Sequence, residues 1–442
     1  RRNMSTQLII CLVIFALTCI GYMTGVWSLG TVAMASLVAL SLTGCLAPSE
    51  ALAYFSNNNV IMIGAMSVVA AGFNRTKFCT DLATGISKMA KGSLSKVLLM
   101  YCILAMLLTQ MVQSPVVVFG IVAPLCMASA ESLGISKAKI SLPLGIVAIS
   151  TCCTLPIGTG ATQAAELNGY IISYYDKIAN FTGTMPEIGF FDPMKARLPM
   201  LIFSVLYCAF VMPKFCPEAP SVATAESSQK ETAARKPLPA FAEVAGIVIF
   251  FGVAIALMLQ ANVLKMVQIW QICIIGAVLM IIFGVLKPRE ALQSIPVSML
   301  LLIVGALAMA GALSATGTGD FIGGGIAKIV TAVNNNYIVG LIFFVVPFIL
   351  TQFMSNRGAM LIFIPIAIAT CYQNGGDPRG LIILIQAGAL TAFMTPMATG
   401  AVPYMMEYGG YDQKDLLKSG WLFAILGCII SVGWIMTIMP VL

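Results

Sequence analysis

The sequence predicts an all-α polytopic membrane protein made of two inverted repeats, each with about five membrane crossings, one re-entrant hairpin and one broken helix. Three observations predict this fold class. Of the 442 residues, 59% are hydrophobic and only 9% are charged. The apolar residues form runs of the length that crosses a bilayer. The second half of the chain also repeats features of the first half in the same order.

Composition also excludes several classes of protein. The chain contains no histidine, which excludes His-based acid–base catalysis and HExxH metal sites, and we expect no enzyme activity. The 13 cysteines are scattered through apolar segments without a CxxC pair, so they predict neither a disulfide framework nor a metal site. The first apolar run, LIICLVIFALTCIGYM, is followed closely by a second one, and we interpret both as retained helices rather than a signal peptide.

Residues 215–237 form the only long polar connection and divide the chain into a first repeat, residues 1–214, and a second repeat, residues 238–442. The apolar segments predicted in the first repeat lie near 7–24, 27–46, 58–74, 97–112, 117–131, 141–157, 161–175 and 198–214. Those of the second repeat lie near 241–260, 268–286, 297–315, 338–353, 358–372, 380–397, 401–411 and 418–440.

A shift of about 241 residues aligns the two halves. The matched pairs include LTQ at 108–110 and 350–352, Ser114 and Ser355, Pro124 and Pro365, and Thr159-Gly160-Ala161 and Thr399-Gly400-Ala401. Because these matches keep one order and nearly one spacing, we predict a duplicated unit.

Each predicted repeat contains one hairpin and one broken helix. The hairpins span residues 97–131 and 338–372, since the arms 97–112 and 117–131 are short for a membrane crossing and Pro115 disfavours a continuous helix. The broken helices span residues 141–175 and 380–411, where LPIGTGAT and TPMATGAVP interrupt runs that are too long for one crossing.

The distribution of positive charge predicts the topology. Five crossings and a hairpin that returns to its own side make the second repeat start opposite to the first, which inverts the two repeats. One side then collects 15 of the 24 Lys and Arg residues, in segments 75–96, 132–140, 214–237, 287–289 and 412–418. The positive-inside rule makes this side, with the 215–237 linker, cytoplasmic. Eight charges, Arg197 among them, fall on the other side with Arg1 and the C-terminus, so we expect a further helix ahead of Arg1.

Irregular backbone is tolerated at membrane depth only where protein or water surrounds it. The four predicted interruptions are Gln113-Ser114-Pro115, Ser355-Asn356-Arg357, Gly158-Thr159-Gly160 and Ala398-Thr399-Gly400. We predict that they converge and bind an anion through hydroxyls, amides and the N–H groups of helix ends. The predicted substrate ligands are Ser114, Thr159, Ser355, Asn356, Arg357 and Thr399, and Gln113, Pro115, Gly158, Gly160, Ala398 and Gly400 supply supporting backbone. Each Ser or Thr taken alone is also consistent with an interhelical hydrogen bond.

Arg357 lies between the apolar runs LIFFVVPFIL and LIFIPIAIAT, and an isolated arginine at the centre of a bilayer costs about 2.5 kcal/mol or more. Its guanidinium can bind a carboxylate through two parallel hydrogen bonds, so an anionic substrate explains its position. The alternative is a structural ion pair with Glu166 or Glu407.

These residues resemble the divalent anion/sodium symporter (DASS) family of the ion transporter superfamily, whose members carry a Ser-Asn-Thr motif at each hairpin tip. SNR at 355–357 keeps two of the three residues and SPV at 114–116 keeps only the serine, each with a proline ten residues after the serine. The resemblance implies a homodimer that carries di- or tricarboxylates, or sulfate in some relatives, by an elevator motion. It also implies that Ser114, Thr159, Ser355, Asn356 and Thr399 contact substrate.

The departures from the family motif bear on coupling to Na⁺. One motif loses an Asn and a Thr, and the other gains the fixed charge of Arg357. We therefore expect a Na⁺-independent carboxylate exchanger without a cofactor or metal, in which Na⁺ is a disfavoured partner. The substrate and the lipid bilayer are its expected partners, nucleic acid is not, and the location is the plasma (inner) membrane. The alternatives are a Na⁺-coupled dicarboxylate or sulfate symporter, another inorganic anion transporter, a Na⁺/H⁺ antiporter, a channel, and a membrane enzyme.

Overall fold

The computed structural model describes residues 6–24, 26–78, 81, 93–112, 114–157, 163–175, 185–221, 238–259, 266–316 and 335–441. Within these ranges every regular element is a helix, which confirms the all-α prediction. The first half contains α1 (Thr6–Thr24), α2 (Leu29–Leu42), α3 (Pro48–Ala53), α4 (Asn58–Asn74), α6 (Leu94–Met111), α7 (Pro115–Ser132), α8 (Ser141–Ser150), α9 (Gln163–Tyr175) and α10 (Asp192–Phe210). The second half contains α11 (Ala240–Leu259), α12 (Ile269–Ile282), α13 (Pro288–Gln293), α14 (Val297–Ala315), α16 (Asn336–Thr351), α17 (Asn356–Asn374), α18 (Arg379–Leu390), α19 (Ala401–Gly409) and α20 (Gln413–Ile438).

The helices have the length and surface of a membrane protein. Within the described residues, six helical stretches are long and apolar enough to cross a bilayer. The outer helices turn large apolar side chains away from the protein, for example Val248 on α11 and Ile429 on α20. Such a surface is stable only against lipid or another apolar surface. The chain is therefore an integral, multi-pass membrane protein.

Helices of the two halves follow one another at a nearly constant offset. The first residues of α2 and α12, 29 and 269, differ by 240, those of α3 and α13, 48 and 288, also by 240, and those of α7 and α17, 115 and 356, by 241. The turns match as well, since Gly44 and Gly284 both have positive φ and lie 240 residues apart. This spacing supports a duplicated unit. The repeat boundaries and the inverted orientation of the two repeats stay predictions.

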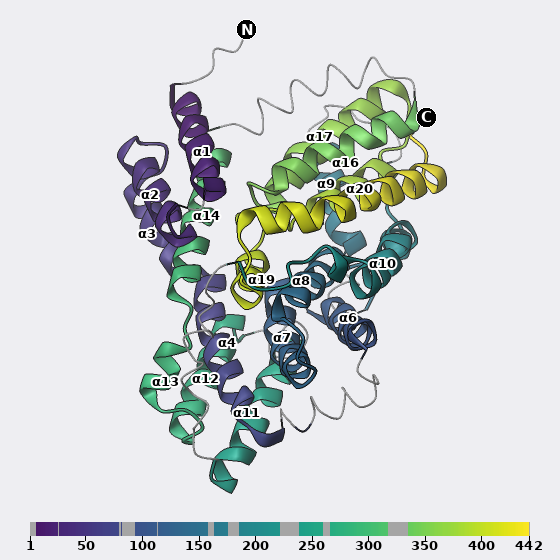
Figure 1. Cartoon of the computed structure of the whole chain (residues 1–442). Helices are drawn as coiled ribbons and strands as arrows, with labels where there is room; N and C mark the ends of the chain where they lie inside the picture. The colour runs from purple at the N-terminus through teal and green to yellow at the C-terminus, as the bar shows by residue number, and fades with distance from the viewer. Residues whose placement is uncertain are drawn as a thin grey trace.

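The helices form two groups in space (Figure 1). Helices α1–α4 and α11–α14 form the group on the left of the view, and α6–α10 and α16–α20 form the group on the right. In the left group α2 packs along α14, and its counterpart α12 packs along α4. This reciprocal pairing means that each half of the chain supplies part of the other half's packing surface.

The predicted hairpins coincide with α6–α7 and α16–α17. Both arms of the first hairpin are 18 residues long, so they are longer than the arms predicted at 97–112 and 117–131. The difference arises because Pro115 begins α7 at its first position, where a helix tolerates proline, and Ser93 begins α6 earlier than the apolar run does. Whether each hairpin returns to its own side of the membrane stays a prediction.

Both predicted broken helices are interrupted in the structure. In the second, α18 ends at Leu390 and α19 begins at Ala401, with no helix between them. In the first, α8 ends at Ser150 and α9 begins at Gln163, and residues 158–162 lie outside the described residues.

Ion pairs join charged segments that the prediction assigns to one side of the membrane. Arg75 pairs with Glu290 at 2.7 Å, and Lys139 pairs with Glu218 at 2.7 Å. Elsewhere, the Trp434 indole of α20 donates to the Lys195 carbonyl oxygen of α10 at 2.8 Å. Which of the two sides is cytoplasmic, and hence the placement of the 215–237 linker, stays a prediction.

Candidate functional site

A serine caps the second arm of each hairpin. Ser114 is the N-cap of α7, and its hydroxyl oxygen accepts the Val117 N–H at 3.4 Å. Ser355 is the N-cap of α17, and its hydroxyl oxygen accepts the Gly358 N–H at 3.1 Å. Because the cap uses each hydroxyl as an acceptor, its proton is left to donate outward. An anion in front of a helix N-terminus is the natural acceptor for that proton.

Arg357 is the second residue of α17, and its side chain is exposed. A cation in the first turn of a helix faces the positive end of the helix dipole, which disfavours it by about 0.3–1 kcal/mol. Among the described residues, no salt bridge within 4.0 Å joins its guanidinium to a carboxylate, so the predicted pairing with Glu166 or Glu407 is not formed there. Neither the helix dipole nor an ion pair among the described residues stabilises the charge of Arg357 in this place.

The second break presents another capping hydroxyl. Thr399 lies just before α19, and its hydroxyl oxygen accepts the Ala401 N–H at 3.1 Å. Gly400 is the N-cap of α19, and the buried Ala398 precedes both residues. Thr399 thus binds an N–H at the start of α19 from one residue before the N-cap, whereas Ser355 is itself the N-cap of α17.

The second hairpin tip is hydrogen-bonded to the second break. The Gln352 side-chain amide donates to the Thr391 carbonyl oxygen at 3.4 Å, and its carbonyl oxygen accepts the Met394 N–H at 2.9 Å. The Thr351 hydroxyl lies 2.9 Å from the Ala389 carbonyl oxygen and 2.7 Å from Oδ1 of Asn356. The structure thus brings Ser355, Asn356, Arg357 and Thr399 onto elements that are directly joined.

The first hairpin tip is joined to the first break in the same way. Gln110 donates to the Thr151 carbonyl oxygen at 2.9 Å and accepts the N–H groups of Thr154 and Leu155 at 3.0 and 2.9 Å. The predicted residues Gln113, Gly158, Thr159 and Gly160 lie outside the described residues. Of the first-half prediction, the structure therefore places Ser114 and Pro115 only.

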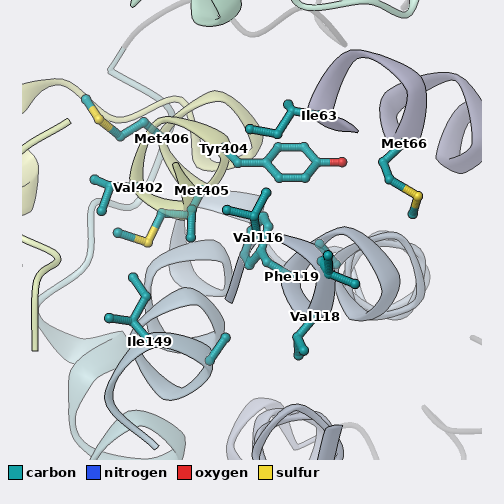
Figure 2. Close-up of a cluster of buried hydrophobic side chains, with 14 of the residues drawn as sticks. Ile63, Met66, Val116, Val118, Phe119, Ile149, Val402, Tyr404, Met405 and Met406 are labelled. Atoms are coloured by element: carbon teal, nitrogen blue, oxygen red, sulfur yellow. The ribbon is translucent and has the colours of Figure 1, made fainter. Parts of the chain in front are cut away.

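The two clusters are connected by contacts that cross between the halves. The Gln386 amide of α18 donates to the Gln163 side chain of α9 at 2.7 Å. On the other side, α19 packs against α7, α8 and α14. Figure 2 shows the Tyr404 ring near the side chains of Ile63, Met66 and Phe119. The rings of Phe119 and Tyr404 are 5.3 Å apart between centroids. Each broken helix therefore packs against the hairpin of the other half.

The sequence did not predict the structural roles of three polar residues that lie near the breaks. Gln110 and Gln352 end the recurring LTQ triplets, which were used only as evidence for a repeat. Arg197 was counted among the charges of the outer side, and its burial inside the protein was not predicted. It lies in α10 with 3% of its surface exposed. Its guanidinium donates to the carbonyl oxygens of Ser150 and Cys153, both at 3.3 Å, at the end of α8.

Replacing Arg197 with methionine should lower the free energy of unfolding by about 2 kcal/mol, because two buried carbonyls lose charged donors and the negative end of α8 loses its counter-charge. Thermal unfolding of the purified protein measures this loss. Lys195→Met is the matched control, since the Lys195 side chain on the same helix is 64% exposed and should hardly matter. Equal stabilities of the two variants would contradict a capping role for Arg197.

An open groove between α2 and α14 is a separate feature. Its wall is mostly apolar, and none of the predicted site residues lines it. Such a wall offers little to an anion.

The chain is similar to known transporters. A family model described as citrate transporter (CitMHS) matches residues 10–385. The uncharacterized transporter YfbS of Escherichia coli is 27% identical over 202 residues, which are 46% of this chain and 32% of that protein. The Na(+)/dicarboxylate cotransporter 3 of Mus musculus is 28% identical over 142 residues, 32% of this chain and 23% of that protein, and the Homo sapiens protein matches to the same extent. The matched regions therefore span about a quarter to a third of these relatives' own length. The structure of Neisseria gonorrhoeae MtrF aligns over 100% of the chain at 12% identity, with a TM-score of 0.39 that supports no inference.

Proposed function

The chain belongs to the citrate transporter family, a family of transporters rather than enzymes, and from this premise we propose that it exchanges di- or tricarboxylates across the membrane without Na⁺. In this proposal one carboxylate of the substrate binds at the N-terminus of α17, between the hydroxyl of Ser355, the amide of Asn356 and the guanidinium of Arg357. The hydroxyls of Ser114 and Thr399 bind other oxygens of the substrate. Thr159 is a further proposed ligand because it matches Thr399 in the sequence repeat.

The single observation that carries the proposal is where Arg357 lies and what surrounds its charge. It stands exposed at the positive end of α17, without an ion pair among the described residues. A bound carboxylate would offset both the charge of the arginine and the dipole of the helix. The arginine would also occupy the surroundings in which a cation would otherwise bind. At about 4 Å and an effective dielectric of 20, a unit charge opposes a Na⁺ ion by about 4 kcal/mol.

Na⁺-coupled symport is the second candidate, and a specific observation favours it. The oxygen atoms of Thr351, Asn356 and Ala389 lie close together, at 2.7 and 2.9 Å from the threonine hydroxyl. Oxygen atoms of this kind can hold a hard cation. Two of the similar proteins are described as Na(+)/dicarboxylate cotransporters. In this candidate Arg357 has a structural role only.

We further propose that transport follows an elevator motion in a homodimer of the plasma membrane. The group α6–α10 and α16–α20, which carries both tips and both breaks, would move against α1–α4 and α11–α14 (Figure 1). Support comes from this division into two groups and from the inverted repeats that the sequence predicts, since repeats of this kind underlie alternating access in many secondary transporters. A channel does not require one group of helices to move against the other.

Uptake of labelled succinate and citrate into proteoliposomes tests the exchange proposal. Vesicles are empty or preloaded with unlabelled carboxylate, and external Na⁺ is present or replaced by choline. We expect uptake that requires internal carboxylate and is unchanged by Na⁺. Uptake into empty vesicles that follows the Na⁺ gradient would establish symport instead. If no carboxylate is taken up but sulfate is, the transported substrate is an inorganic anion instead.

A further inference from the structure

We propose that Gln110 and Gln352 are matched positioning residues, which hold each hairpin tip against the break of its own half so that the tip keeps the geometry needed to bind substrate. The second part of this inference, the effect on substrate binding, rests on the proposed function. The two glutamines and the backbone groups that they bind are called the glutamine latches below.

The geometry of the two latches is the same. Each glutamine lies at the end of the first hairpin arm and follows a buried threonine, Thr109 or Thr351. Its amide nitrogen donates to the carbonyl oxygen of the residue that follows the first half-helix, Thr151 or Thr391, and its carbonyl oxygen accepts an N–H three residues later, from Thr154 or Met394. In both halves the same amide nitrogen also donates to the carbonyl four residues earlier in its own arm, at 2.8 and 2.9 Å.

The chemistry of a helix break explains why glutamine occupies both positions. When a helix stops inside the protein, its last carbonyls and the N–H groups that follow lose their partners, and burial makes each unpaired group costly. Gln110 and Gln352 are only 1% and 4% exposed. A carboxamide supplies two N–H donors and an acceptor oxygen without a charge, so one side chain can satisfy both sides of the break. Leucine or methionine supplies neither, and an ionised glutamate supplies no donor.

The two latches differ in what they reach at the tip. In the second half, the Thr351 hydroxyl lies 2.7 Å from Oδ1 of Asn356 and therefore connects the latch to a predicted substrate ligand. In the first half, Pro115 occupies the position that corresponds to Asn356, and the Thr109 hydroxyl lies 3.3 Å from the Thr151 hydroxyl instead. Loss of Gln352 should therefore disturb carboxylate binding more than loss of Gln110 does.

The first test needs no transport. Hydrogen exchange is measured on the purified protein and on Gln352→Met, which keeps an unbranched side chain of similar length. We expect faster exchange of the amide of Met394 and its neighbours in the break. Gln271→Met is the control, because Gln271 only accepts a local cap bond from Gln268 N–H in α12, at 2.8 Å, far from the breaks in sequence. If Gln352→Met fails to fold, Gln110→Met replaces it, with the amides of Thr154 and Leu155 as reporters. Unchanged exchange at the break would overturn the latch.

The second test separates positioning from a general loss of stability. Equilibrium binding of labelled citrate and succinate is measured for Gln352→Met, Ser355→Ala and the double variant. We expect Gln352→Met alone to weaken binding by about tenfold. The double variant should lose less than the product of the two single effects, because both act through the same tip. Effects that multiply would mean that Gln352 does not position Ser355, and would overturn the inference.

Gln352→Glu adds a pH-dependent readout. A protonated glutamate keeps one donor and an acceptor, one donor fewer than glutamine, whereas the ionised form has no donor and buries a charge. Affinity of this variant should approach that of the unmodified protein as the pH is lowered, and Gln352→Met should show no such recovery. The same pH profile for both variants would contradict the latch. If the unmodified protein binds no carboxylate at all, the proposed function fails, and hydrogen exchange still decides whether the latch exists.

Discussion

Replacing Arg357 with threonine should weaken carboxylate binding by at least about tenfold. The substitution restores the third residue of the Ser-Asn-Thr motif that SNR at 355–357 resembles. It removes a charge-assisted and potentially bidentate contact worth about 1.5–3 kcal/mol, which corresponds to a loss of roughly 10- to 150-fold. Binding and exchange of labelled succinate measure the effect. We also expect the weak residual binding to become sensitive to Na⁺, because the fixed charge that opposed a cation is gone.

Two further variants make the Arg357 result specific. Arg357→Lys keeps the charge but loses the planar fork, so its loss should be intermediate. Arg289→Thr is the matched control, since Arg289 is also an exposed second residue of a helix, α13, and lies outside the predicted site. Full carboxylate binding by Arg357→Thr would contradict the proposed role and leave the arginine with a structural one.

Replacing Gly305 with valine should prevent α2 and α14 from packing and should cost about 3 kcal/mol or more of folding free energy. A Cβ atom at Gly305 would lie 2.6 Å from the carbonyl carbon of Ala33 and 2.7 Å from its Cβ. At the other end of the same contact, a Cβ at Gly30 would lie 2.6 Å from the Ser298 carbonyl oxygen. The two helix backbones touch at both points, and a backbone atom cannot move aside as the end of a flexible side chain can.

Thermal unfolding and the yield of monodisperse protein measure the Gly305 effect. Gly433→Ala is the control, because Gly433 lies inside α20 and a Cβ there would meet nothing within 4 Å. This control should be neutral, or more stable by up to about 1 kcal/mol from helix propensity. A stable, fully active Gly305→Val variant would show that the α2–α14 contact is looser than the structure describes.

The fold was predictable largely because its signals are local or periodic. Apolar runs locate most helices, and the proline and glycine interruptions at LPIGTGAT and TPMATGAVP locate both breaks. The arms of the first hairpin were predicted too short, since residues at a helix start, such as Pro115 of α7, can lie outside the apolar run. The recurring LTQ triplets indicated a repeat, but spacing alone could not show that Gly305 meets Ala33.

The candidate site was predictable only in part, because its polar bonds join residues far apart in the chain. Ser114 and Ser355 stand before predicted helices, and their capping role follows from sequence. Gln110 and Gln352 bind backbone groups some 40 residues away, which local pattern cannot reveal. Arg197 was counted only as a charge on one side of the membrane, and only the three-dimensional packing shows its guanidinium at the end of α8.

The central claim is that this protein binds a carboxylate with a fixed positive charge in place of Na⁺. Equilibrium binding of labelled citrate and succinate to the purified protein, in Na⁺ and in choline at equal ionic strength, tests it most directly. The account predicts one affinity in both salts for the unmodified protein and a loss of that affinity in Arg357→Thr. Binding that is at least tenfold tighter in Na⁺ than in choline would contradict it and would make Na⁺ a part of the site.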